Sequence, residues 1–142
     1  WRKHLGIEVS ILQQDWPVYL ENQRKLNFDI ARAGWVGDYS DPFTFLSIFR
    51  STAGNNNTGW ANPKYDEMML ASTREKDVAN RMKILHDGEE ILLDELPIMP
   101  IFWRMNSRLE RPEVQNWKAS MISHRCYKAI SLGPYQPLPP YP

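Results

Sequence analysis

The sequence of 142 residues predicts an α/β fold, and three features near its start indicate it. Residues 7–15 alternate imperfectly between apolar and polar side chains, as a strand does. Residues 28–34 form a short apolar run that ends at a glycine, which is typical of a buried strand. Residues 16–23 lie between them and have a helical pattern, with Pro17 near the start. This order predicts a right-handed crossover unit with parallel strands.

Residues 1–5 have the composition of the last turn of a helix. Basic side chains favour a helix C-terminus, and Gly6 follows as a stop signal. We therefore expect the chain to begin inside a helix whose earlier turns precede it.

Further helices are expected after residue 42. Residues 43–49 form a dense apolar group that is typical of a short buried helix. Residues 51–59 are rich in glycine and asparagine and predict a surface loop. An Asn-Pro pair starts a predicted helix over 62–72, and an aspartate caps another over 77–93. Apolar residues recur at helical spacing along the last helix, where Gly88 is a predicted point of close packing.

The C-terminal third predicts fewer elements. Residues 98–105 read as a strand at a sheet edge, because prolines flank its start, and residues 128–132 are a candidate strand. Trp60 and Trp103 are expected in the core. Five prolines after Gly133 predict an extended tail, so the expected domains are residues 1–133 and a tail of residues 134–142.

Composition excludes several classes of function. The 17 basic and 17 acidic residues cancel, which removes the electrostatic argument for a nucleic acid or anionic membrane partner. The single cysteine, Cys126, cannot form a disulfide within the chain. Its neighbour His124 does not make it a protease site, because such partners are seldom adjacent in sequence. The three histidines lack metal-ligand spacing, so no metal or cofactor is predicted.

A loop rich in aromatic and acidic residues follows the predicted strand over 28–34. Trp35, Asp38, Tyr39 and Asp41 come directly after the strand end, where open α/β sheets bind ligands. Carboxylates bind a cation, and aromatic rings shield it from water. These residue types suit a ligand with a positive charge and exposed amides.

This loop also carries a resemblance to a known family. Residues 32–42, Arg-Ala-Gly-Trp-Val-Gly-Asp-Tyr-Ser-Asp-Pro, resemble the Trp-x-x-Asp-Tyr-x-Asp/Glu-Pro segment of the oligopeptide- and dipeptide-binding proteins of bacterial ABC importers, solute-binding protein family 5. Residues 1–9, 81–93 and 96–102 have counterparts in the same order. The resemblance implies the C-terminal portion of such a protein, within the larger C-terminal lobe of a two-lobed periplasmic-binding-protein fold of type II-like form.

The resemblance implies roles for six residues of the loop and the strand before it. Asp38 matches the aspartate that pairs with the peptide α-amino group. Backbone groups near Val36 and Gly37 would bind the peptide main chain, beside the aromatic residues Trp35 and Tyr39. Arg32 needs an anion, and both a structural carboxylate and a ligand carboxylate remain open.

Each acidic residue has a structural alternative. Asp41 with the proline after it is a good helix cap, which we favour for Asp41, whereas we favour ligand binding for Asp38. No nucleophile lies nearby, so no catalytic residue and no enzyme is predicted. The alternatives are a relative that carries nickel, haem or a sugar, a hydrolase, and a protein-interaction module without a cleft.

The resemblance also implies partners and a location. The expected partners are a peptide and, for the full-length protein, a membrane ABC permease. The expected location is extracytoplasmic, either in the periplasm or lipid-anchored at the cell surface, with the signal upstream of this sequence. We expect the isolated chain to self-associate, because it lacks the cover of the remaining lobe.

Overall fold

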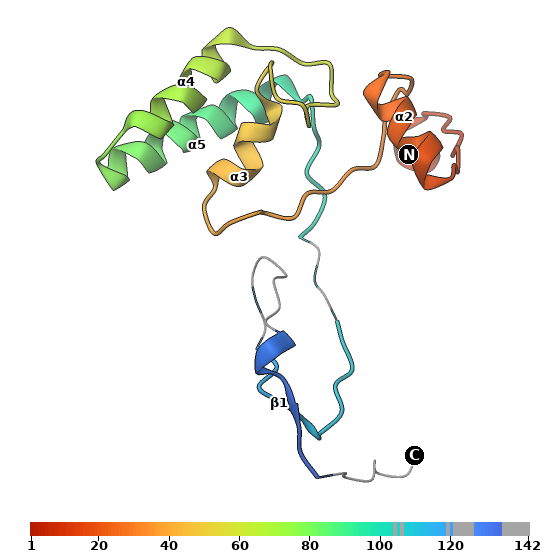
Figure 1. Ribbon diagram of the computed structural model, residues 1–142. Coiled ribbons are helices and arrows are strands. Elements are labelled where there is room, and N and C mark those ends of the chain that lie inside the picture. The colour runs from red at the N-terminus through yellow and green to blue at the C-terminus, as the bar shows by residue number, and fades with distance from the viewer. Residues whose placement is uncertain (104, 106, 119, 121–126, 135–142) are drawn as a thin grey trace.

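The computed structural model describes residues 1–103, 105, 107–118, 120 and 127–134. The helices between residues 43 and 95 lie together, and the two N-terminal helices lie to one side of them (Figure 1). A small sheet near the C-terminus lies at the far end of the molecule. Cys126, His124 and residues 135–142 of the predicted tail lie outside the described residues.

The two longest helices are α4 (Pro63–Arg74) and α5 (Val78–Glu95), and they pack against each other. The Asn62 side chain accepts a hydrogen bond from the Tyr65 amide at 3.1 Å. The Asp77 carboxylate accepts one from an amide in the first turn of α5 at 2.8 Å. These bonds satisfy amides that have no partner inside the helix, so both predicted helix starts are confirmed.

Gly88 allows α4 and α5 to approach closely. It is buried, and a Cβ there would lie 2.6 Å from the Cε atom of Met69 on α4. Its predicted role in close packing is confirmed.

The core lies between α4, α5 and the short helix α3 (Phe43–Leu46), which continues into the 3-10 turn η1 (Ser47–Phe49). Tyr65 is fully buried, and its hydroxyl donates a hydrogen bond to the Leu46 carbonyl at 2.7 Å. Burial raises the pKa of Tyr65, so the phenol stays protonated as a donor. The predicted apolar helix over 43–49 is therefore confirmed. The buried apolar residues are Leu46, Tyr65, Met69, Leu85 and Leu92.

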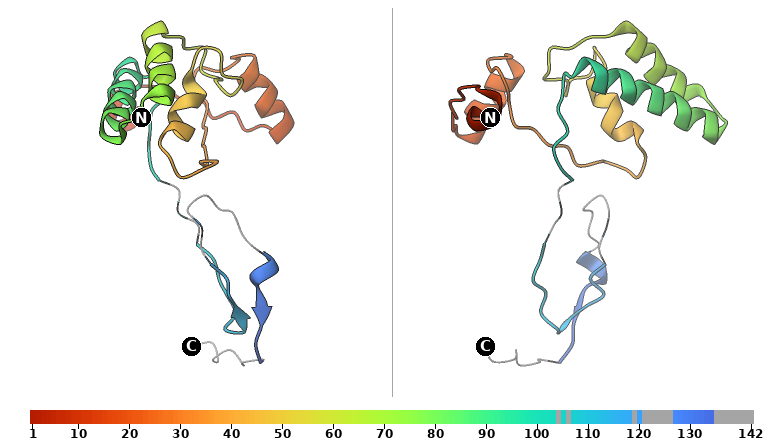
Figure 2. Two further views of the ribbon diagram at one scale, coloured as in Figure 1. Left: turned by 60° about the vertical axis from the view of Figure 1, so that its left-hand side comes forward. Right: turned by 180° about the vertical axis from the view of Figure 1, so that it is seen from behind.

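The N-terminal helices are α1 (Arg2–Leu5) and α2 (Trp16–Arg24). Helix α1 ends at Gly6, whose φ of 67° is the left-handed conformation that glycine adopts without strain. Pro17 lies in the first turn of α2. Both predictions are confirmed, and the right-hand view of Figure 2 shows these helices apart from α3, α4 and α5.

The expected strands over 7–15, 28–34 and 98–105 are wrong as paired strands. Their described residues form no ladder with any described strand. Side chains there are exposed, including Ile11 at 93% and Trp103 at 88%, so the prediction that Trp103 lies in the core is also wrong. A strand satisfies its backbone groups through a neighbouring strand, and no described strand pairs with these segments.

The one sheet among the described residues pairs β1 (Val114–Gln115) with β2 (Ser131–Leu132) in antiparallel register. Val114 lies opposite Leu132, and Gln115 lies opposite Ser131. The candidate strand over 128–132 is confirmed only at its end, because Tyr127–Ala129 form the 3-10 turn η2. Within the described ranges, no helix has the length and apolar character needed to cross a bilayer.

Candidate functional site

The loop after residue 34 and the loop after η1 together line an open cavity of about 320 Å³. The first loop contributes two aromatic rings and a carboxylate. The second contributes small polar residues and an arginine. The lining residues are Trp35, Asp38, Tyr39, Thr44, Ser47, Ile48, Arg50, Thr52, Ala53, Gly54 and Asn55.

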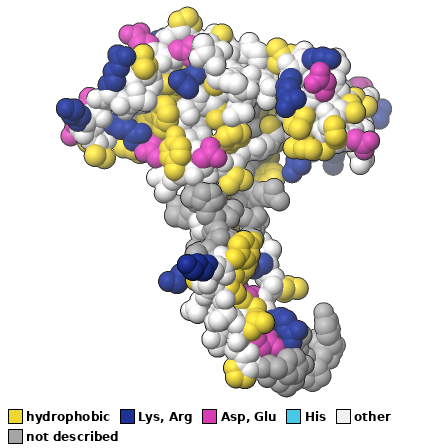
Figure 3. All heavy atoms as spheres, in the orientation of Figure 1, with side chains coloured by type: hydrophobic (Ala, Val, Ile, Leu, Met, Phe, Trp, Pro, Cys, Tyr) yellow, Lys and Arg dark blue, Asp and Glu magenta, His cyan; other side chains and the backbone are white. Residues whose placement is uncertain are grey.

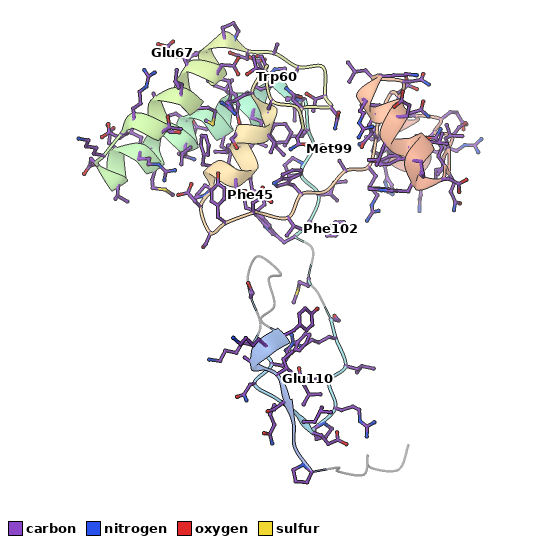
Figure 4. All side chains as sticks on the ribbon, viewed as in Figure 1. Phe45, Trp60, Glu67, Met99, Phe102 and Glu110 are labelled. Carbon is purple, nitrogen blue, oxygen red and sulfur yellow. The ribbon has the colours of Figure 1, made fainter. Side chains whose placement is uncertain are left out.

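The first loop is held against the start of α3. The Asp38 amide donates a hydrogen bond to the Thr44 hydroxyl at 3.0 Å, and Thr44 is buried. Gly37 is also buried, and a Cβ there would lie 3.0 Å from the Phe45 ring and 3.0 Å from the Thr44 methyl group. Phe45 lies on α3 in Figure 4. Gly37 is thus needed for space, since its φ is not among the positive values that favour glycine.

Asp41 fixes the other end of this loop. One carboxylate oxygen accepts a hydrogen bond from the Phe43 amide at 2.9 Å, which confirms the predicted role of Asp41 at the helix start, although Pro42 is the boundary residue. Arg81 on α5 donates two hydrogen bonds to the same carboxylate, at 2.7 and 2.9 Å. The loop is therefore connected to both α3 and α5.

This ion pair shifts the pKa of Asp41 and the pKa of Arg81. Hydrogen bonds from Arg81 hold the pKa of Asp41 below its usual value, against the opposing effect of burial. The pKa of Arg81 is raised, mainly by its hydrogen bonds to Asp41. Both groups therefore stay charged near neutral pH.

A single asparagine organises the second loop. The side-chain amide of Asn56 donates hydrogen bonds to the carbonyls of Phe49 at 3.1 Å, Arg50 at 3.2 Å and Trp60 at 3.0 Å. These bonds connect the end of η1 to Trp60, which comes shortly before α4. The predicted surface loop over 51–59 therefore folds back on itself. Its inner residues form one wall of the cavity.

The six predicted site residues do not all reach the cavity. Trp35, Asp38 and Tyr39 line it. Val36 is 56% exposed and Gly37 packs on α3, so these two flank the cavity without lining it. Arg32 is exposed, and its carbonyl accepts a hydrogen bond from the Tyr19 hydroxyl.

Sequence reasoning missed the residues that complete the site. Thr44 follows Asp41 by three residues at a helix start, where hydroxyl side chains often bond to nearby backbone, so this signal was readable. Arg81 had no local signal, because its partner Asp41 is distant in sequence, and Arg50 had none, because the loop of Asp38 that shares its cavity is a separate segment.

The site presents an unpaired carboxylate between aromatic walls. Among the described residues, no basic side chain forms an ion pair with Asp38. Nor does that part of the chain contain a group of side chains that could hold a metal ion. The carboxylate and the aromatic rings suit a cationic group.

Comparison with known proteins identifies the family of this chain. The profile "Bacterial extracellular solute-binding proteins, family 5 Middle" matches residues 1–57. The oligopeptide-binding protein OppA of Bacillus subtilis is 38% identical over 104 residues, which cover 72% of this chain and 19% of that protein.

Two solved structures share the fold. The murein tripeptide binding protein MppA of Escherichia coli superposes with a TM-score of 0.85 at 32% identity, over 95% of this chain and 27% of that chain. Haemophilus influenzae OppA in complex with RPPGFSPFR gives 0.77 at 35% identity, over 84% and 23%.

The chain spans about a fifth to a quarter of the length of these relatives. Their fold is the two-lobed fold of periplasmic binding proteins, which confirms the expected fold class even though three expected strands are unpaired here. The relatives are solute-binding proteins rather than enzymes. Sequence and structure together show that the chain belongs to the bacterial extracellular solute-binding proteins of family 5.

Proposed function

We propose that this chain supplies the amine-recognising loop of a protein that binds peptides for uptake by an ABC importer. The observation that supports this most is the position of Asp38. It lines a cavity beside Trp35 and Tyr39, its amide is anchored to Thr44, and no described basic residue neutralises it.

The chemistry follows from these contacts. An ammonium group at Asp38 forms charge-assisted hydrogen bonds, which are about twice as strong as neutral ones. The aromatic rings of Trp35 and Tyr39 reduce competition from water. Val36 and Gly37 flank the cavity, and their backbone groups are the ones that we assign to the peptide main chain, which every peptide shares. Arg32 lies outside the cavity and serves as a second anchor only for a longer ligand.

The relatives support the same ligand class. OppA of Bacillus subtilis is named for oligopeptide binding, and the Haemophilus influenzae structure is a complex with RPPGFSPFR. By analogy, the partners of the whole protein are a peptide and a membrane permease, with no nucleic acid. Its location is extracytoplasmic, in the periplasm or lipid-anchored at the cell surface, and it has no catalytic activity.

The test is calorimetry on the full gene product that carries this chain. Asp38→Asn removes the charge and keeps the shape, so peptide affinity should fall about a hundredfold or more. N-acetylation of the peptide should weaken wild-type binding similarly and barely affect the variant, because both changes remove the same ion pair.

Asp29→Asn is the matched control, because Asp29 is also an exposed carboxylate but does not line the cavity. It should bind peptide as the wild type does. Equal wild-type affinity for free and acetylated peptides would contradict the role of Asp38.

A further inference from the structure

Arg50 brings a second charge into the cavity that Asp38 lines. It follows η1 and is partly buried, and its Nε atom donates a hydrogen bond to the Ser47 carbonyl at 3.1 Å. This bond fixes the base of the guanidinium group. The Arg50 carbonyl is held by Asn56 at 3.2 Å, so the backbone beneath the side chain is fixed as well.

Arg50 differs from Arg81, the other partly buried arginine near the site. Both terminal nitrogens of Arg81 bond to Asp41, at 2.7 and 2.9 Å. No carboxylate within the described residues forms an ion pair with Arg50. A guanidinium group that loses part of its water without gaining an anion is costly, unless a ligand supplies the anion.

Arg50 and Asp38 do not neutralise each other. Both side chains line the cavity, yet they form no ion pair, so their charged atoms are not in contact. The hydroxyl side chains of Ser47 and Thr52 line the same cavity and are suited to hydrogen bonding with a polar ligand. One cavity thus has an anionic and a cationic wall.

We propose that Arg50 binds a carboxylate on the ligand, so that the site prefers peptides with an acidic first residue. In such a peptide the α-ammonium group and the side-chain carboxylate are a few bonds apart. The ammonium binds Asp38 while the carboxylate accepts two hydrogen bonds from Arg50. This inference rests on the proposed function, because it assumes that Asp38 binds the peptide amino group.

The experiment compares two tripeptides, Glu-Ala-Ala and Gln-Ala-Ala, which differ in charge but hardly in shape. Calorimetry on the full gene product should show about tenfold tighter binding of the Glu peptide. Arg50→Met should remove this preference, so that the two peptides bind the variant with equal affinity. Arg50→Lys should retain part of the preference. The control Arg24→Met alters an exposed arginine of α2 that does not line the cavity and should retain all of it.

The outcomes separate this inference from the proposed function. Equal wild-type affinities for the two peptides, or an unchanged preference in Arg50→Met, would overturn the role of Arg50. The proposed function would still stand if N-acetylation of either peptide weakened binding. Absence of binding by either peptide to the wild type would overturn both.

Discussion

The helices between residues 43 and 95 bury apolar side chains against one another. The extended segments before and after them leave most of theirs exposed. Every buried apolar residue of the core lies between Leu46 and Leu92. The extended segments over 7–15, 28–36 and 98–103 have exposed apolar side chains instead, such as Ile11 and Trp103. Met99 and Phe102, 55% and 73% exposed, lie along the connection that leaves the helices (Figure 4).

This difference shows which structural features are encoded locally. A helix makes its backbone hydrogen bonds within one segment, whereas a strand needs a second segment. Figure 3 shows apolar side chains on the surface around the N-terminal helices and on the part that contains the sheet. Such surfaces are typical of regions that other protein surfaces cover.

The largest effect is expected in the core. Tyr65→Ala removes a fully buried ring together with its hydrogen bond to the Leu46 carbonyl. It should destabilise the helical part by about 3–5 kcal/mol, as loss of a large buried aromatic side chain does. Urea unfolding followed by far-ultraviolet circular dichroism measures this change.

Trp103→Ala is the matched comparison, because it removes a ring that is 88% exposed. It should change the free energy of unfolding by less than about 0.5 kcal/mol. A Trp103 effect as large as that of Tyr65 would show that the extended segment packs within this chain.

The second-largest effect is expected on the association of the chain with copies of itself. The exposed apolar side chains of the extended segments should drive the 142-residue chain to form dimers or larger species. Size-exclusion chromatography with light scattering measures the mass. Ile11→Lys should shift it toward the monomer, whereas a wild-type monomer would contradict the prediction.

Self-association and the open cavity also limit binding by the isolated chain. An exposed ion pair contributes about 0–1 kcal/mol, and micromolar affinity needs about 8 kcal/mol. The 142-residue chain alone should therefore bind peptides no more tightly than about millimolar. Micromolar binding by this chain would mean that it contains a complete cleft.

A smaller effect than in the core is expected at the ion pair that connects the site loop to the helices. Arg81 and Asp41 are 25% and 30% exposed at their side chains, so solvent weakens their attraction. Arg81→Met should cost about 1 kcal/mol of unfolding free energy.

The same pair predicts a pH dependence. Arg81 lowers the pKa of Asp41 in the folded state, so the contribution is present above the usual aspartate pKa of about 4. It is lost as the pH falls through the lowered pKa of the folded state. The stability difference between wild type and Asp41→Asn should therefore be larger at pH 7 than below that pKa. A difference that does not change with pH would show that the charge contributes nothing.

The sequence predicts the local features of the site better than its long-range contacts. Helix starts at Asn62 and Asp77 were predictable, because capping side chains lie within a few residues of the amides they bind. The motif around Asp38 identified the loop. The positions of Arg50 in the same cavity and of Arg81 at Asp41 were not predictable, because only the folded chain brings them to the loop.

Hydrogen–deuterium exchange of the 142-residue chain tests the central claim most directly. If the helical part is self-sufficient, amides in α4 and α5 should exchange slowly, because their hydrogen bonds surround the buried core. Amides of residues 7–15 and 28–36 donate no backbone hydrogen bond to a described residue, so they should exchange at nearly the rate of an unfolded chain. Equal protection of these segments and of α4 and α5, at a concentration at which the chain is a monomer, would contradict the account, because the segments would then be paired within this chain.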